Sequence, residues 1–232
     1  MPENILSSQP ALAASLIGVP AALAALLFAG RLRRSVALAG VIGALLLVPL
    51  AWLGQNARLS PQPGAFSPVL ANVIASVWLG CLVWFAASLP FRARLRLEIG
   101  AGRVVLRLVA VAVRGLAFGL VLWLTGASPV TTLLLALLGV GAVLGWRAPA
   151  HWRLSVAALS GFVPVYMALS IVAAVLVPEV SGIWRGSDAL GQRLWLLPLK
   201  DLAIVVVFAA VYPLILGWVY AARFERPGIP PG

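Results

Sequence analysis

The chain has 232 residues, of which 62% are hydrophobic and 10% are charged, and its formal net charge is +11. Soluble domains are about 45–50% apolar and about 25% charged, so this composition excludes a soluble globular fold, a disordered chain and a fibrous protein. Since stretches this apolar must satisfy their backbone hydrogen bonds internally, the sequence predicts an all-α, polytopic integral membrane protein.

Seven apolar runs have about the 20 residues that are needed to cross a bilayer. In chain order they are Ala11–Gly30, Ser35–Leu53, Pro68–Pro90, Val104–Leu124, Pro129–Trp146, Leu154–Pro178 and Leu196–Val219. The segments that connect them are too short to fold separately. We therefore predict a bundle of seven transmembrane helices that forms a single transmembrane domain over residues 1–232, with no soluble domain.

Proline and glycine mark special points within these runs. Kinks are expected at the prolines inside the runs, because proline removes a helical hydrogen bond. These prolines are Pro20, Pro49, Pro164, Pro198 and Pro213. Two pairs of glycines four residues apart, Gly115 with Gly119 and Gly141 with Gly145, predict points where helices approach closely.

Basic residues are distributed unevenly between alternate connecting segments. One set of segments holds Arg31, Arg33, Arg34, Arg92, Arg94, Arg96, Arg103, Arg147, Arg153, Arg223 and Arg226, whereas the other holds only Arg58, Arg185 and Arg193. Arginine-rich segments stay in the cytoplasm, so the N-terminus is predicted outside and the C-terminus in the cytoplasm. We expect a multi-pass protein of the bacterial inner membrane, with anionic lipids on its cytoplasmic side as partners.

Four charged residues lie inside the runs: Arg107, Arg114, Lys200 and Asp201. Arg114 is about ten residues into its run, roughly 15 Å deep and near the midplane, where an unpaired charge is costly. One hypothesis pairs Arg114 with Asp201 and lets Lys200 extend outward. In the alternative, Lys200 and Asp201 both lie at the outer interface and Arg114 bonds to backbone carbonyls.

Arg103, Arg107 and Arg114 fall on one helix face, because they are four and seven residues apart. They form a basic stripe that leads from the cytoplasmic headgroups into the bilayer, and Arg107 is close enough to the boundary to reach those headgroups. The stripe predicts a site for an anionic lipid or a lipid-linked substrate. The alternative is a structural stripe that contacts lipid phosphates and backbone carbonyls.

Two connecting segments have patterns of their own. Phe91–Ile99 alternates apolar with charged residues, which favours a segment lying on the anionic inner surface. Ser187 and Asp188 are residues that begin helices well, so a short helix through Trp195 is expected on the outer side.

Aromatic residues fit the same frame. Trp218 falls at a predicted inner interface, where tryptophan anchors helices. Trp78 and Trp84 lie deeper in their run, which favours a packing or lipid-facing role.

Residues for catalysis or metal binding are scarce. The single histidine, His151, has no acidic residue near it in sequence, and the single cysteine, Cys81, is expected to be a core residue. No carboxylate pair lies inside the runs. We therefore predict no catalytic residue, no metal site, no cofactor and no nucleic-acid partner, while the question of enzymatic activity stays open.

Three function classes remain. The first is a non-catalytic membrane subunit or scaffold of a larger complex, with other membrane subunits or further copies of the chain as partners. The second is a lipid-handling protein, an enzyme or a flippase, that recognises an anionic lipid through its intramembrane arginines. The third is a small channel or carrier, for which the polar lining of the runs is sparse.

Overall fold

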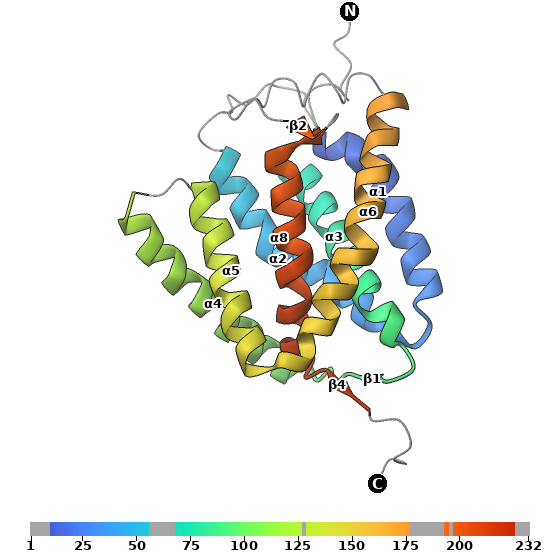
Figure 1. The fold of residues 1–232 in the computed structure, drawn as a ribbon, viewed down its shortest axis with the longest axis vertical. Coiled ribbons are helices and arrows are strands. Elements are labelled where there is room, and N and C mark those ends of the chain that lie inside the picture. Colours follow the sequence, from blue (N-terminus) through green and yellow to red (C-terminus); the bar gives the residue numbers. More distant parts are fainter. Residues whose placement is uncertain (1–9, 56–67, 127–128, 177–192, 195–196, 226–232) are drawn as a thin grey trace, which may run out of the picture. The chain divides into compact units, whose positions relative to one another are not determined.

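The computed structural model describes residues 10–55, 68–126, 129–176, 193–194 and 197–225 (Figure 1). These residues are mostly helical (87%). They form the helices α1 (Pro10–Phe28), α2 (Arg33–Gln55), α3 (Pro68–Ser88), α4 (Ala101–Leu124), α5 (Pro129–Arg147), α6 (Trp152–Leu176) and α8 (Leu199–Val219). Three single-turn 3₁₀ helices, η1 (Gly30–Leu32), η2 (Leu89–Phe91) and η3 (Pro149–His151), and four two-residue strands complete the structure of the described part.

Each of these helices overlaps one of the predicted apolar runs, so the all-α class is confirmed. Four stretches, in α3, α4, α6 and α8, are long and apolar enough to cross a membrane. Shorter apolar stretches lie in α1 and α5.

The segment before α8 differs from the prediction. The last run was expected to be helical from Leu196, but α8 begins at Leu199, directly after Pro198. Proline disfavours the helical conformation in the residue before it, which explains the later start. Arg193–Leu194 (β2) pairs antiparallel with Leu197–Pro198 (β3). The short helix predicted through Trp195 is therefore wrong at Arg193 and Leu194. Its other residues lie outside the described part.

The chain divides into two compact units, so the single domain stays a prediction. The first unit comprises residues 1–82 and 163–206. In it, α1 and α2 form a helical hairpin through η1, where Gly30 has a φ of +54°. The helices pack closely: a Cβ on Gly18 would lie 2.3 Å from the ring of Trp78, and the buried Cys81 thiol donates to the Val36 carbonyl over 3.4 Å.

Arg33 closes the same hairpin. Its Nε donates to the Leu26 carbonyl at 3.0 Å and its Nη2 to the Leu27 carbonyl at 3.5 Å. These carbonyls belong to the last turn of α1, where no later helical N–H group is available to donate to them. A basic side chain at this point satisfies them and opposes the negative end of the helix dipole.

The second unit comprises residues 83–162 and 207–232. In this unit α4 and α5 lie side by side as an antiparallel pair (Figure 1). A Cβ on Gly141 of α5 would come within 2.9 Å of Val211 on α8, and one on Gly145 within 2.6 Å of Trp152. The close approach predicted for this glycine pair is therefore confirmed.

The other predicted glycine pair behaves differently. A Cβ on Gly115 would meet nothing within 4 Å, and one on Gly119 would only reach Thr132 at 4.0 Å. Within the described residues, the close approach predicted at Gly115 is therefore not used.

The aromatic residues of the second unit build its core. Trp84 and Tyr220 are fully buried and meet edge to face, with ring centres 5.2 Å apart. Of the two roles expected for Trp84, packing or lipid-facing, the structure shows packing. Ser155 of α6 is also buried and donates to the Ala210 carbonyl of α8 at 2.6 Å, close to Pro213 within that helix.

A small antiparallel strand pair closes the end of this unit (Figure 1). Leu95–Arg96 (β1) pairs with Arg223–Phe224 (β4), and Leu95 is buried while Arg96 is exposed. Two more backbone bonds extend the pair, from Glu98 N–H to Tyr220 and from Glu225 N–H to Arg94. We call these two strands and their flanking residues, Arg94–Glu98 and Tyr220–Glu225, the clasp. The alternation read in Phe91–Ile99 thus belongs to a strand at this point, because successive side chains of a strand point to opposite faces.

The end of α8 determines how the chain enters the clasp. Ala221 has a φ of +46°, a left-handed conformation that is unusual for a residue other than glycine. Its N–H bonds to the Trp218 carbonyl, and the N–H of Ala222 bonds to the Gly217 carbonyl. This is the Schellman arrangement, in which a left-handed residue turns the chain and satisfies the last helical carbonyls.

Candidate functional site

Two arginines of α4 meet one tryptophan in the last turn of α8. Arg107 and Arg114 share a helix face because they are seven residues apart. Their guanidinium carbons lie 5.7 and 5.6 Å from the centre of the Trp218 ring, within the range of a cation–π interaction. All three side chains are half-buried. The sequence identified both arginines but predicted only an anchoring role for Trp218.

Arg107 caps the C-terminal end of α8. Its Nη1 donates to the Trp218 carbonyl at 3.0 Å and to the Val219 carbonyl at 3.4 Å. These carbonyls lie in the last turn of the helix, where the helix dipole is negative and helical partners run out. Sequence reasoning expected this side chain to reach the headgroups, and did not foresee that the end of α8 would accept its protons.

Arg114 bonds to a backbone carbonyl, which was one part of the second alternative for this residue. Its Nη1 donates to the carbonyl of Ala110, one turn earlier on α4, at 3.1 Å. Long side chains on helices point back toward the N-terminus, which carries this guanidinium away from its own Cα toward the start of α4.

The pairing of Arg114 with Asp201 stays a prediction, since the side chains of Lys200 and Asp201 lie outside the described residues. Asp201 belongs to the first turn of α8, whereas Trp218, which Arg114 contacts, belongs to its last turn.

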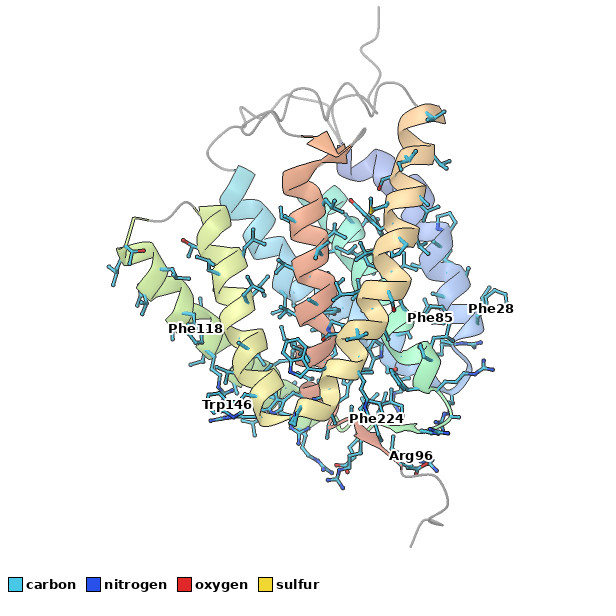
Figure 2. All side chains as sticks on the ribbon, viewed as in Figure 1. Phe28, Phe85, Arg96, Phe118, Trp146 and Phe224 are labelled. Carbon is cyan, nitrogen blue, oxygen red and sulfur yellow. The ribbon has the colours of Figure 1, made fainter. Side chains whose placement is uncertain are left out.

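Arg103, the third member of the predicted stripe, takes part in an ion-pair cluster instead. It donates to Glu98 at 3.0 Å, and Arg223 reaches the other carboxylate oxygen of Glu98 at 3.5 Å. A further ion pair joins Arg96 to Glu225 across the clasp, where Figure 2 labels Arg96. Since these side chains are well exposed, each pair contributes at most about 1 kcal/mol. The cluster thus neutralises part of the positive charge around the clasp.

Arg107 and Arg114 differ from Arg103 in this respect. Within the described part of the chain, neither guanidinium has a carboxylate partner. Each uses only Nη1 in hydrogen bonds, so its Nε and Nη2 groups donate to no described residue. Three N–H groups on each arginine are therefore left for water or a ligand, in the fork geometry that suits a carboxylate or a phosphate.

His151 is a further residue whose position sequence reasoning missed. It is 93% buried, and its Nε2 lies 3.0 Å from the Ala222 carbonyl, which makes Nε2 the protonated nitrogen. Its Nδ1 is buried without a hydrogen-bond partner in the described structure and faces the backbone of Gly217. A small residue at Gly217 gives the imidazole room, so His151 ties η3 to the clasp rather than serving as an exposed interfacial residue.

The described side chains of this region indicate what kind of group it could hold. The described residues contain no cluster of three or more histidine, cysteine, aspartate or glutamate side chains that would hold a metal ion. The two arginines and Trp218 offer positive charge, forked N–H donors and an aromatic face, which together suit a phosphate or carboxylate group. Comparison of the chain with protein-family models, with curated proteins and with solved structures finds no match.

Proposed function

We propose that this chain is a non-catalytic subunit or scaffold of a larger complex in the bacterial inner membrane. In this proposal all seven helices span the membrane, with the N-terminus outside and the C-terminus in the cytoplasm. The match between seven apolar runs and seven helices supports the number of spans. The unequal distribution of arginine between alternate connecting segments supports the orientation.

Helix ends provide a second argument for the orientation. With the N-terminus outside, α1 and α8 both end on the cytoplasmic side. Arg33 and Arg107 bind the last carbonyls of these two helices, so the arginines sit where the negative helix ends require positive charge. Arg33 thereby serves both topology and capping, whereas Arg107, which lies inside an apolar run, serves as a cap.

The observation that carries the scaffold proposal is the exposed apolar surface of α4. Only 11% of its apolar stretch is buried within the chain, against 61% of that of α8. Its most exposed side chains include Leu106 at 71% and Leu116 at 73%. Gly115 lies beside Leu116 with open space around it, so the backbone of another helix can approach closely there. We assign this surface to a helix of another membrane subunit.

Fusions test the proposed orientation. A fluorescent protein on the C-terminus should fluoresce in cells, whereas alkaline phosphatase at the same position should be inactive, because that enzyme requires the periplasm. A phosphatase placed on the N-terminus should be active. The opposite pattern of activities would refute the orientation but would leave the helical fold intact.

Photo-crosslinking tests the scaffold role. A photoreactive amino acid at Leu116 should give discrete protein adducts in native membranes, whereas the same group at Val156 of α6, which is 61% exposed, should give lipid adducts only. Extraction in a mild detergent should then retain the crosslinked partner in stoichiometric amount. If Leu116 gives lipid adducts only and the protein purifies alone and monodisperse, the scaffold proposal is wrong.

A further inference from the structure

We propose that Arg107, Arg114 and Trp218 form a binding site for the phosphate group of an anionic membrane lipid. The proposal goes beyond the scaffold role, because it assigns a ligand to the one place where two arginines of a predicted span converge. It rests on charge balance, on unused hydrogen-bond donors and on the position of the site along α4.

Charge balance is the first argument. Two guanidinium groups that lie within 5.7 Å of one ring centre are at most about 11 Å apart and repel one another. Arg103 has Glu98 beside it, but no described carboxylate faces Arg107 or Arg114. Charged side chains within spans are stable when they are paired, and a lipid phosphate would supply the negative charge that no described residue supplies at this site.

The unused donors are the second argument. Nε and Nη2 of each arginine have no acceptor among the described residues, and these are the atoms that bind a phosphate through two parallel hydrogen bonds. Among the described residues the one fully buried side-chain nitrogen without a partner is Nδ1 of His151. The free donor atoms of the two arginines are therefore not fully buried.

Position along the helix is the third argument. Arg107 is about 9 Å from the start of α4, and Arg114 is about 20 Å from it but extends back toward Ala110. The Arg107 guanidinium is therefore the nearer of the two to the start of α4, where a lipid phosphate is available and long basic side chains extend, and the Arg114 side chain reaches back toward it.

Native mass spectrometry of the full-length protein in a neutral detergent tests the site. We expect cardiolipin and phosphatidylglycerol to remain bound at lipid concentrations where phosphatidylcholine, which has no net charge, does not. Arg114→Gln should weaken binding of the anionic lipids by about tenfold or more, the value of a hydrogen bond to a charged group. Arg114→Lys keeps the charge but not the fork and should bind with intermediate affinity.

Arg147→Gln is the matched control. Arg147 is exposed at the end of α5 in the same unit and makes no hydrogen bond or ion pair with a described residue, so its loss removes one charge without touching the site. Binding by this variant should change less than about twofold. Since Arg114→Gln removes one bond to Ala110, size-exclusion chromatography should show it folded and monodisperse.

Four results would overturn the proposal, the last of them only in its assignment to a lipid headgroup. Equal loss of binding in Arg114→Gln and Arg147→Gln would show attraction by net charge alone. Equal retention of phosphatidylcholine would show that the anion is irrelevant. Unchanged lipid binding in Arg114→Gln would place the lipid elsewhere. Displacement of the lipid by millimolar inorganic phosphate would keep the phosphate chemistry but overturn the assignment to a headgroup.

Discussion

Arg107 gives the sharpest test of how the end of α8 is held. Arg107→Met keeps an unbranched side chain of similar length and removes the guanidinium. The substitution deletes the hydrogen bonds to the carbonyls of Trp218 and Val219, the cation–π contact with the Trp218 ring and the positive charge at the helix end. The apolar contacts of the stem remain.

The size of the effect follows from these contacts. A hydrogen bond to a charged group contributes about 1.5–3 kcal/mol and a cation–π contact about 0.5–1 kcal/mol at an exposed site. The lower end applies because Arg107 is half-exposed, the bond to Val219 is long, and the Trp218 carbonyl keeps its bond from Ala221. We expect a loss of about 1.5–2 kcal/mol, which lowers the melting temperature by about 3–8 °C.

Cys81 provides the assay. It is the only cysteine of the chain and is 3% exposed, so a dye that fluoresces on reaction with a thiol reports unfolding without any engineered label. Melting curves in one detergent should be recorded for the wild type, for Arg107→Met and for Arg147→Met. The last variant loses an exposed arginine and should stay within about 0.5 kcal/mol of the wild type.

The reasoning fails if Arg107→Met and Arg147→Met melt at the same temperature. In that case the carbonyls at the end of α8 would be satisfied equally well without the guanidinium. A loss far above 3 kcal/mol would also contradict the argument, because it would show that Arg107 stabilises the unit by more than its hydrogen bonds and its contact with Trp218 account for.

Four further substitutions test other parts of the second unit, each by the same melting assay. Ala221→Gly should stabilise the protein by about 0.5–1 kcal/mol, since glycine adopts a left-handed φ without steric cost, and a lower melting temperature would contradict the turn geometry. Gly141→Ala should destabilise the protein by about 1–3 kcal/mol, because its Cβ would lie 2.9 Å from Val211. Gly115→Ala, in open space, should be neutral or stabilise the protein by up to about 1 kcal/mol. Equal effects of the two substitutions would refute the difference in packing. Ser155→Ala should cost about 0.6 kcal/mol and no more than about 1.7, as hydrogen bonds between membrane helices do, and no change would mean that the bond to α8 is without net value.

The arginines near the helix ends make contacts that a count of charges on each side of the membrane does not reveal. The sequence interpreted Arg33 and Arg103 as topology signals, which concerns their number on one side of the membrane. In the structure Arg33 binds the last carbonyls of α1 and Arg103 binds Glu98. A positive residue near a helix C-terminus therefore serves two purposes, and Arg107 shows that the helix it caps can be distant in sequence.

Several structural features of this protein can be predicted from its sequence alone. The helices could be located from hydropathy, because lipid leaves an apolar segment no alternative to internal hydrogen bonding. The helix α5 was predicted to begin at Pro129 and end at Trp146, and it ends one residue later. The place of Cys81 within an apolar run also predicted its core position. For Trp84 the same argument predicted a packing or lipid-facing role, and the structure shows packing.

The clasp and the arginine site were decided by tertiary structure. Nothing local connects Leu95 with Phe224 or Arg107 with Trp218, because these pairs are more than 100 residues apart and meet only when α8 packs within its unit. Helix positions depend on neighbours in sequence, and sequence therefore predicts them. The packing of distant helices decides which carbonyl Arg107 caps and which ring both Arg107 and Arg114 contact. The periodicity of the sequence carries no information about this packing.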